Sequence, residues 1–187
     1  MIKLFSVKKE QQKAAEDKKD GVRKLTPGEI RLQKDLSELN LEGKTTIEFP
    51  EGRDKTTHFH IVFQPVTGMY QGGSFTFDFN ILPGYPHEAP KVRCLTKVYH
   101  PNIDTQGNVC LNILREDWKP VLSINSLVYG LMYLMTEPNP DDPLNREAAE
   151  AMRSNKAQFE QVVRRLVAGG GYVGTEHFPK CQGITQR

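Results

Sequence analysis

The sequence has few cysteines and lacks any long hydrophobic run. Its 187 residues contain only three cysteines, Cys94, Cys110 and Cys181, which are widely spaced. An odd number of cysteines without metal-site spacing fits a reducing compartment, so we expect a cytoplasmic and nuclear protein. No apolar segment approaches the length of a membrane-spanning helix. Residues 1–5 are also too short for the hydrophobic region of a signal peptide and run into lysines.

The sequence also lacks an excess of charge and a nucleotide-binding motif. The 25 Lys and Arg residues stand against 23 Asp and Glu residues, and the net charge of +2 indicates no particular partner. No glycine-rich Walker pattern is present. We therefore expect no cofactor, no metal, and neither a nucleic acid nor a membrane as partner. An apolar content of 37% suffices for one core, so the chain is expected to form one domain with a tail.

Residues 1–25 differ in composition from the rest. They carry eight basic and four acidic side chains, about +4 in total, and residues 6–24 offer little to bury. This pattern predicts a flexible arm. Its start is apolar, with Ile2, Leu4, Phe5 and Val7. These four residues are either part of a frayed terminus or a peptide that docks into a groove of a partner.

Residues 26–39 are predicted to form a helix. Thr26 is a suitable N-cap, Pro27 suits the first helical position, and Glu29 completes a capping box. Three leucines recur on one face, and three charged residues are expected on the solvent side. The leucines are Leu32, Leu36 and Leu39, and the charged residues are Arg31, Lys34 and Asp35.

Four strands and three further helices are predicted downstream. Residues 45–49, 58–64, 74–82 and 91–94 are enriched in β-branched and aromatic residues or alternate in polarity. Tyr85-Pro86 is a plausible cis bond in the turn before the last strand. Helices are expected after Ser123, with an apolar stripe that packs in the core, and over about residues 145–153 and 155–167.

His58 and His60 are two residues apart and are expected to share one face of their strand. Such a pair can contribute to a metal site. No further ligand stands nearby in the sequence, so we interpret them as ordinary strand histidines.

Residues 100–117 are the expected functional site. Pro101 and Gly107 interrupt regular structure on either side of a turn. Cys110 follows, and its neighbours Val109 and Leu111 are expected to lie in the core while its sulfur faces a groove. For a free cysteine alone, a buried structural thiol is the usual alternative.

Asn102 lies eight residues before Cys110. Its carboxamide cannot act as a base or nucleophile at neutral pH, but its NH2 group can donate a hydrogen bond. It is therefore a candidate to stabilise an oxyanion formed at Cys110. The alternative is a turn amide bonded to the backbone, and both interpretations can hold together.

The tripeptide His100-Pro101-Asn102, its spacing to Cys110, and Trp118 resemble the active site of the ubiquitin-conjugating enzymes. The resemblance covers about residues 26–180. It implies an α+β fold, with a four-stranded antiparallel meander sheet flanked by an N-terminal helix and C-terminal helices, and an active-site flap after the fourth strand. It divides the chain into a docking arm, residues 1–25, and a catalytic domain, residues 26–187.

The same resemblance implies the chemistry. Cys110 would accept a modifier as a thioester from an activating enzyme and pass it to a substrate lysine. Asp142 occupies the family's acidic loop position, where it would orient the lysine and accept its proton; the alternative is a turn carboxylate. Asn112 stands where many members have aspartate.

Four segments also resemble the members of this family that carry the ubiquitin-like modifier Nedd-eight (Rub). They are residues 1–8, 33–35, 99–104 and 111–122. Their resemblance implies that the substrates are cullin lysines, that a RING ligase assists, and that the chain is a monomer.

The residues implied in docking fall into three groups. The heterodimeric activating enzyme would contact Leu4, Phe5, Val7, Arg31 and Lys34. A co-ligase of the defective-in-cullin-neddylation family would bind acetylated Met1 with Ile2 and Leu4. The RING ligase would contact His87, Trp118, Pro120 and Val121.

Three alternatives remain open from the sequence. Ubiquitin itself is the first alternative cargo. A non-catalytic binding module of the same fold is the second, although this chain keeps Cys110, Asn102 and Asp142. A cysteine hydrolase with His100 as the base is the third, and it lacks an obvious residue to orient His100.

Overall fold

The computed structural model describes residues 24–184. The predictions for Met1, Ile2, Leu4, Phe5 and Val7 therefore lie outside the described residues. Among residues 24–184, no helix has the length and apolarity needed to cross a membrane.

The central element is a four-stranded antiparallel sheet in the order β1-β2-β3-β4. Its strands are β1 (Thr46–Glu48), β2 (His58–Phe63), β3 (Phe75–Asn80) and β4 (Lys91–Cys94). The meander and all four strand positions agree with the prediction, with ends that differ by one or two residues. A cis peptide bond joins Tyr85 to Pro86 in the turn between β3 and β4, as predicted.

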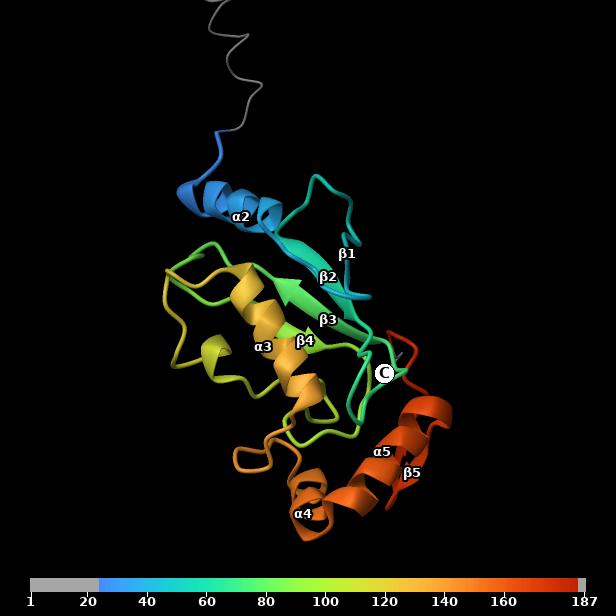
Figure 1. The fold of residues 1–187 in the computed structure, drawn as a ribbon. Coiled ribbons are helices and arrows are strands. Elements are labelled where there is room, and N and C mark those ends of the chain that lie inside the picture. The colour runs from blue at the N-terminus through green and yellow to red at the C-terminus, as the bar shows by residue number, and fades with distance from the viewer. Residues whose placement is uncertain (1–23, 185–187) are drawn as a thin grey trace, which may run out of the picture.

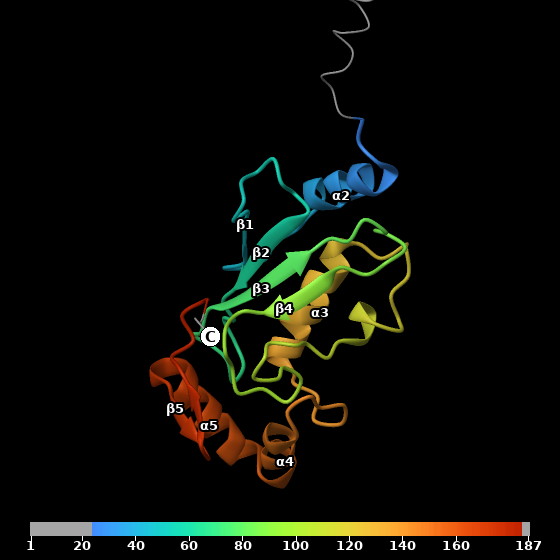
Figure 2. The same cartoon turned by 180° about the vertical axis from the view of Figure 1, so that it is seen from behind.

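The helices cover one face and both ends of this sheet. Figures 1 and 2 show α3 (Ile124–Thr136) running across one face, α2 (Pro27–Ser37) at one end, and α4 (Arg146–Ser154) and α5 (Lys156–Gly169) at the other. A 3-10 turn, η1 (Asn112–Leu114), lies in the long segment between β4 and α3. The other face of the sheet is not covered by a helix among the residues that the structure describes (Figure 2).

The N-terminus of α2 forms as its sequence predicts. The Thr26 hydroxyl accepts a hydrogen bond from the Glu29 backbone, and the Glu29 carboxylate accepts one from the Thr26 backbone. These bonds satisfy two of the backbone donors that a helix start leaves unpaired. Leu32 is buried and packs against the sheet core, so α2 is fixed to the rest of the domain.

The core lies between the sheet and α3. One face of α3 is fully apolar and buried, and each such side chain contributes roughly 1.5–3 kcal/mol relative to exposure. Its residues are Ile124, Leu127, Val128, Leu131, Leu134 and Met135, as predicted. Aromatic side chains of the two central strands meet this stripe, including a stacked pair of Phe59 and Phe79 with ring centroids 5.1 Å apart.

Asp35 is buried, and the prediction of a solvent-facing side chain is wrong. Only 3% of the residue is exposed, and its carboxylate accepts hydrogen bonds from Arg31 Nε at 2.9 Å and from the Tyr85 hydroxyl. A carboxylate tolerates burial only with such partners. Its position on α2 thus ties the helix to the segment around Tyr85.

The C-terminal segment contains a hairpin that the sequence analysis did not predict. Strands β5 (Gly171–Val173) and β6 (Glu176–Phe178) pair antiparallel after α5. Phe178 is buried and packs against Tyr99, with ring centroids 5.4 Å apart. The hairpin therefore supports the chain just before the expected functional site.

Candidate active site

A tight turn at residues 104–107 positions the segment that contains Cys110. The Asp104 carboxylate accepts hydrogen bonds from the backbone amides of Gln106 and Asn108 at 2.9 and 2.8 Å. Gly107 adopts a positive φ of 82°, a conformation that favours glycine. Its carbonyl accepts a hydrogen bond from the backbone amide of Cys94 at 2.8 Å, which fastens the turn to β4.

Cys110 lies at the edge of a groove of about 310 Å³. Its backbone amide donates to the carbonyl of Asn102 at 2.8 Å, and its thiol donates to Asp142 Oδ2 at 3.0 Å. Val109 is buried and Leu111 is partly buried against the core, as predicted. The groove is lined by Asn102, Cys110, Leu111, Asn112, Ile113, Gly130, Tyr133, Leu134, Glu137, Asn139 and Asp142.

The Cys110 thiol is protonated at neutral pH. Burial raises the pKa of Cys110 to about 11, the hydrogen bond to Asp142 acts in the same direction, and Arg115 opposes both. With such a pKa, roughly one thiol in ten thousand is ionised at pH 7. This pKa lies above the ordinary value for cysteine because the sulfur is desolvated and faces a carboxylate.

Asn102 connects the Cys110 segment to the loop over residues 137–145. Its side-chain amide donates to the carbonyls of Asn139 at 2.7 Å and Asp142 at 3.0 Å. Its side-chain oxygen accepts from the backbone amide of Asn139 at 2.9 Å. Both N–H bonds of the carboxamide are thus engaged, as expected for the turn-amide interpretation. To stabilise an oxyanion at Cys110, Asn102 would have to give up one of its two hydrogen bonds to the loop carbonyls and donate to the oxyanion instead.

Backbone hydrogen bonds also hold this loop. The carbonyl of Pro101 accepts hydrogen bonds from the amides of Leu144 and Asn145, each at 2.9 Å. Arg153 of α4 donates to the carbonyl of Pro140. The loop is therefore attached on both sides of Asp142, which keeps that carboxylate beside the Cys110 sulfur.

His100 is a structural residue. It is buried, its ring stacks on Tyr70 with centroids 5.0 Å apart, and burial lowers its pKa to about 4. Its Nδ1 accepts from the Asn102 backbone amide at 2.9 Å. Its Nε2 consequently carries the proton and donates to the carbonyl of Leu134 at 3.0 Å. Because both ring nitrogens are bonded to backbone, His100 does not act as the base of a cysteine hydrolase.

The residues implied in ligase docking lie in two segments that one hydrogen bond joins. Trp118 Nε1 donates to the carbonyl of Pro86 at 2.8 Å, which joins the segment after η1 to the loop that carries His87. His87 and Pro120 are exposed, and Val121 is 81% exposed. The two segments that carry these residues are therefore joined by this hydrogen bond.

Arg31 and Lys34, implied in docking of the activating enzyme, differ in availability. The Arg31 guanidinium donates to Asp35 and to the carbonyls of Pro120 and Leu122 at 2.8 and 2.7 Å. Arg31 therefore holds α2 against the segment of residues 120–122. Lys34 is exposed and has only a 3.9 Å ion pair with Glu38, so it is the more accessible of the two.

Comparison with known proteins identifies the family. The family model described as ubiquitin-conjugating enzyme matches residues 31–167. The chain belongs to the ubiquitin-conjugating enzyme family. Cys110, Asn102 and Asp142 thus meet in a groove of a ubiquitin-conjugating domain, as the resemblance implies.

Individual relatives match nearly the whole chain. The NEDD8-conjugating enzyme Ubc12 of Arabidopsis thaliana is 55% identical over 184 residues, which cover 97% of this chain and 100% of the relative. The Nedd8-conjugating enzyme UbcE2M of Drosophila melanogaster is 50% identical, and the match covers 97% and 98% of the two chains. Among solved structures, Saccharomyces cerevisiae Ubc12 superposes with a TM-score of 0.77 at 39% identity, covering 94% of this chain and 97% of that chain.

Two side chains, Asp35 and Asp78, have roles that their sequence positions did not indicate. The helical spacing placed Asp35 on the solvent side of its helix. Its hydroxyl partner, Tyr85, lies far along the chain, so the spacing could not indicate the burial of Asp35. Asp78 also escaped notice, and the statement that no further ligand stands near His58 and His60 is wrong. Asp78 lies opposite His60 in the β2–β3 register. Strand alternation in residues 75–80, with polar residues at every second position, was the pattern that could have indicated it.

Proposed function

We propose that the protein accepts the ubiquitin-like modifier NEDD8 (Nedd-eight, or Rub) as a thioester on Cys110 and transfers it to a lysine. The observation that carries the proposal is the 55% identity to a NEDD8-conjugating enzyme over 97% of this chain. The groove beside Cys110 supplies the chemistry that this activity requires. Ubiquitin remains the alternative cargo, and a non-catalytic module is disfavoured because Cys110 lines the groove.

In the first step, the Cys110 sulfur attacks the thioester carbonyl of the modifier on the activating enzyme. A new carbon–sulfur bond forms, the bond to the activating enzyme's cysteine breaks, and that cysteine departs as a thiolate. A cysteine suits this exchange because its thiolate is both a strong nucleophile and a good leaving group. The Cys110 proton must leave as the sulfur attacks, and Asp142 Oδ2 at 3.0 Å is the side-chain acceptor in contact with it.

In the second step, a substrate lysine attacks the Cys110 thioester. An isopeptide bond forms, and Cys110 leaves. The lysine begins as an ammonium with a reference pKa of about 10.4, so it must lose a proton before attack. A desolvated groove lowers that pKa. Asp142 would orient the lysine and accept the proton, and Asn102 would stabilise the oxyanion after exchanging one loop bond.

The partners follow from the same proposal. We propose cullin lysines as substrates, with a RING ligase on the surface formed by His87, Trp118, Pro120 and Val121. Lys34 and Arg31, together with Leu4, Phe5 and Val7, would contact the activating enzyme. Acetylated Met1, Ile2 and Leu4 would meet a co-ligase of the defective-in-cullin-neddylation family.

The organisation of the protein is also part of the proposal. The chain would consist of a docking arm, residues 1–25, and a catalytic domain, residues 26–187, acting as a monomer. Its expected location is the cytoplasm and nucleus. The three cysteines are all free, which supports a reducing compartment.

A loading assay tests the proposed function. The protein is incubated with ATP and either NEDD8 and its activating enzyme or ubiquitin and its activating enzyme. We expect a thiol-reducible adduct with NEDD8, which Cys110→Ala abolishes and the control variants Cys94→Ala and Cys181→Ala retain. Faster loading with ubiquitin would contradict the choice of modifier, and an adduct on the Cys110→Ala protein would contradict the choice of nucleophile.

A further inference from the structure

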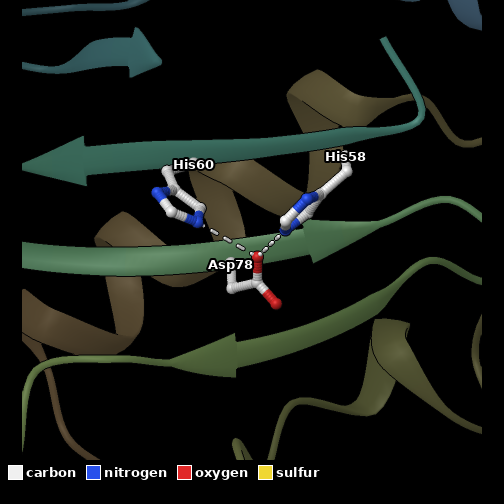
Figure 3. Close-up of side chains that lie close together, drawn as sticks. All are labelled: His58, His60 and Asp78. Atoms are coloured by element: carbon white, nitrogen blue, oxygen red, sulfur yellow. Dashed lines mark hydrogen bonds and ion pairs between the residues drawn. The ribbon is translucent and has the colours of Figure 1, made fainter. Parts of the chain in front are cut away.

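Three metal-binding side chains meet on the face of the sheet that no described helix covers. His58 and His60 of β2 and Asp78 of β3 point toward one another on this face (Figure 3). Their neighbours in β2, Phe59 and Ile61, point to the opposite side, into the core. The cluster is thus separate from the Cys110 groove and takes no part in the transfer chemistry.

The distances within the cluster approach those between the ligands of a small metal ion. The three ligand atoms lie within 4.8 Å of one another. Ligands of a tetrahedral zinc ion stand about 3.3 Å apart, because Zn–N and Zn–O bonds are about 2.0–2.2 Å long. His60 Nε2 and Asp78 Oδ1 are 3.3 Å apart. His58 Nε2 and the same oxygen are 2.6 Å apart, so a small rotation of the carboxylate would bring this pair to the required separation.

A second carboxylate lies behind the cluster. Glu51 Oε1 stands 2.8 Å from His58 Nδ1 and accepts its proton, while Asp78 Oδ1 stands 2.6 Å from His58 Nε2 on the other side of the ring. Carboxylates in this position orient metal-bound histidines and increase their basicity. A metal ion bound at His58 Nε2 would take the place of the proton that Asp78 Oδ1 accepts there, while Glu51 keeps the Nδ1 proton.

The basic side chains around the cluster are directed elsewhere. Lys55 pairs with the other Glu51 oxygen, Oε2, at 3.0 Å. Arg93, which is the register partner of Asp78 on β4, donates to the carbonyl of Gln106. Asp78 Oδ1 contacts imidazole nitrogens of both histidines, at 2.6 Å from His58 and 3.3 Å from His60.

We propose that His58, His60 and Asp78 bind a divalent transition-metal ion, with Zn²⁺ as the preferred ion. Two imidazoles and one carboxylate are typical zinc ligands, whereas Mg²⁺ and Ca²⁺ prefer oxygen alone. Three protein ligands leave the fourth position of a tetrahedral site for water or a side chain of a partner. The site would also bridge β2 and β3 on the uncovered face of the sheet.

Calorimetric titration of the full chain with Zn²⁺ tests the proposal. We expect one ion bound per chain in the wild type and more than about tenfold weaker binding in His60→Gln and Asp78→Asn. Glu51→Gln removes the negative charge of the outer acceptor and should weaken binding by up to about 10–100-fold. His177→Gln, which changes an exposed histidine of β6 outside the cluster, is the matched control and should bind as the wild type does.

Cobalt absorption locates the ion independently. Co²⁺ bound at the proposed site should give visible bands without sulfur-to-cobalt charge transfer, because none of the three ligands is a cysteine. All variants should keep the metal-free circular dichroism spectrum and loading rate of the wild type, which excludes misfolding as the cause of lost binding. Unchanged affinity in His60→Gln and Asp78→Asn, a thiolate charge-transfer band, or no binding of micromolar Zn²⁺ would each overturn the proposal.

Discussion

At the residue scale, Cys110 and Asp142 modify each other's chemistry. The carboxylate raises the pKa of the thiol, in addition to the larger effect of burial. Asp142→Asn removes the negative charge, so the pKa of Cys110 should fall while staying above the ordinary value for cysteine. At pH 8 the thiolate fraction then rises, and alkylation of Cys110 by iodoacetamide should be faster than in the wild type.

The measurement is the pH profile of Cys110 alkylation, followed by mass spectrometry of the peptide that contains this residue. Asp141→Asn is the matched control, because the neighbouring carboxylate is exposed and pairs with Arg153 at 3.9 Å rather than with the thiol. The same Asp142→Asn variant should discharge its thioester to lysine more slowly. Equal alkylation midpoints in Asp142→Asn and wild type would show that the carboxylate does not influence the thiol.

Asn102 has a structural role that is visible in its hydrogen bonds and a proposed catalytic role that is not. Asn102→Ala leaves the backbone amide and carbonyl of Asn139 and the carbonyl of Asp142 without their partner, which should cost about 1–3 kcal/mol of unfolding free energy. If Asn102 also serves the oxyanion, discharge to lysine should fall by about 10²–10³, and loading should be affected less.

Single-turnover loading and discharge, together with urea unfolding, separate these two roles. A loss of discharge far beyond the loss of loading supports the oxyanion role. Equal losses in the two steps, with a lower unfolding free energy, would leave Asn102 with the structural role alone.

At the scale of elements, α2 is held so closely to the segment around Tyr85 that one glycine is required. A Cβ on Gly28 would lie 2.4 Å from the backbone oxygen of Tyr85, so Gly28→Ala must shift the helix or the segment. Despite the better helix propensity of alanine, we expect a loss of about 1–3 kcal/mol in unfolding free energy.

Urea unfolding at equilibrium checks this expectation. Gly169→Ala at the end of α5 is the control, because a Cβ there meets nothing within 4 Å. It should be neutral or stabilise by up to about 1 kcal/mol. A Gly28→Ala protein as stable as the wild type would mean that the contact between α2 and Tyr85 relaxes without cost.

The sequence predicts well those elements whose pattern involves residues close together in the chain. The capping box at Thr26 and the apolar stripe of α3 depend on residues three or four apart, so their structure follows from local spacing. Asp35 was misplaced because its partner Tyr85 lies 50 residues away. The β5–β6 hairpin was missed because its strands have three residues each and are anchored by Phe178 against Tyr99.

The candidate site divides in the same way. The motif around residues 100–110 indicated the nucleophile and its groove. The raised pKa of Cys110 and the full engagement of Asn102 depend on how the 137–145 loop folds over them, which no local pattern reports. The cluster of His58, His60 and Asp78 required the register between two strands, since Asp78 is 20 residues from His58.

At the scale of the whole molecule, the N-terminal arm is expected to serve binding rather than folding. Deleting residues 1–24 should leave the unfolding temperature unchanged, because residues 6–24 offer little to bury and α2 is capped by Thr26. Loading with NEDD8 should slow, since the arm would add a tethered contact to that of α2, and tethered contacts multiply through effective concentration.

Loading rates at limiting activating enzyme decide the role of the arm. Phe5→Ala should reproduce much of the deletion defect, because interface energy concentrates in a few apolar anchors, and Lys13→Ala is the control that should do little. Shuffling residues 8–24 should be tolerated if they only span distance. A truncated protein that loads as fast as the full chain would exclude a docking role for the arm.

The burial of His100 has a consequence for the protein in acid. Its pKa is about 4 when folded, against an ordinary value of 6.5, so below pH 6.5 the unfolded chain binds a proton that the native state excludes. The neutral, buried His100 therefore costs the folded state nothing above pH 6.5. As the pH falls from 6.5 toward 4, the free energy of unfolding should fall by on the order of 3 kcal/mol. Unfolding free energies measured between pH 7 and 4 should show this loss, and His100→Gln should show a shallower slope.

Protonation of His100 would also break one particular hydrogen bond, the one between its Nδ1 and the Asn102 backbone amide. A charged imidazole can no longer accept at Nδ1 from the Asn102 backbone amide, although it can still donate to Leu134 of α3. Asn102 in turn holds the loop that carries Asp142. Acid inactivation should therefore begin at the conjugation site, with thioester formation failing at a higher pH than the one at which the sheet unfolds.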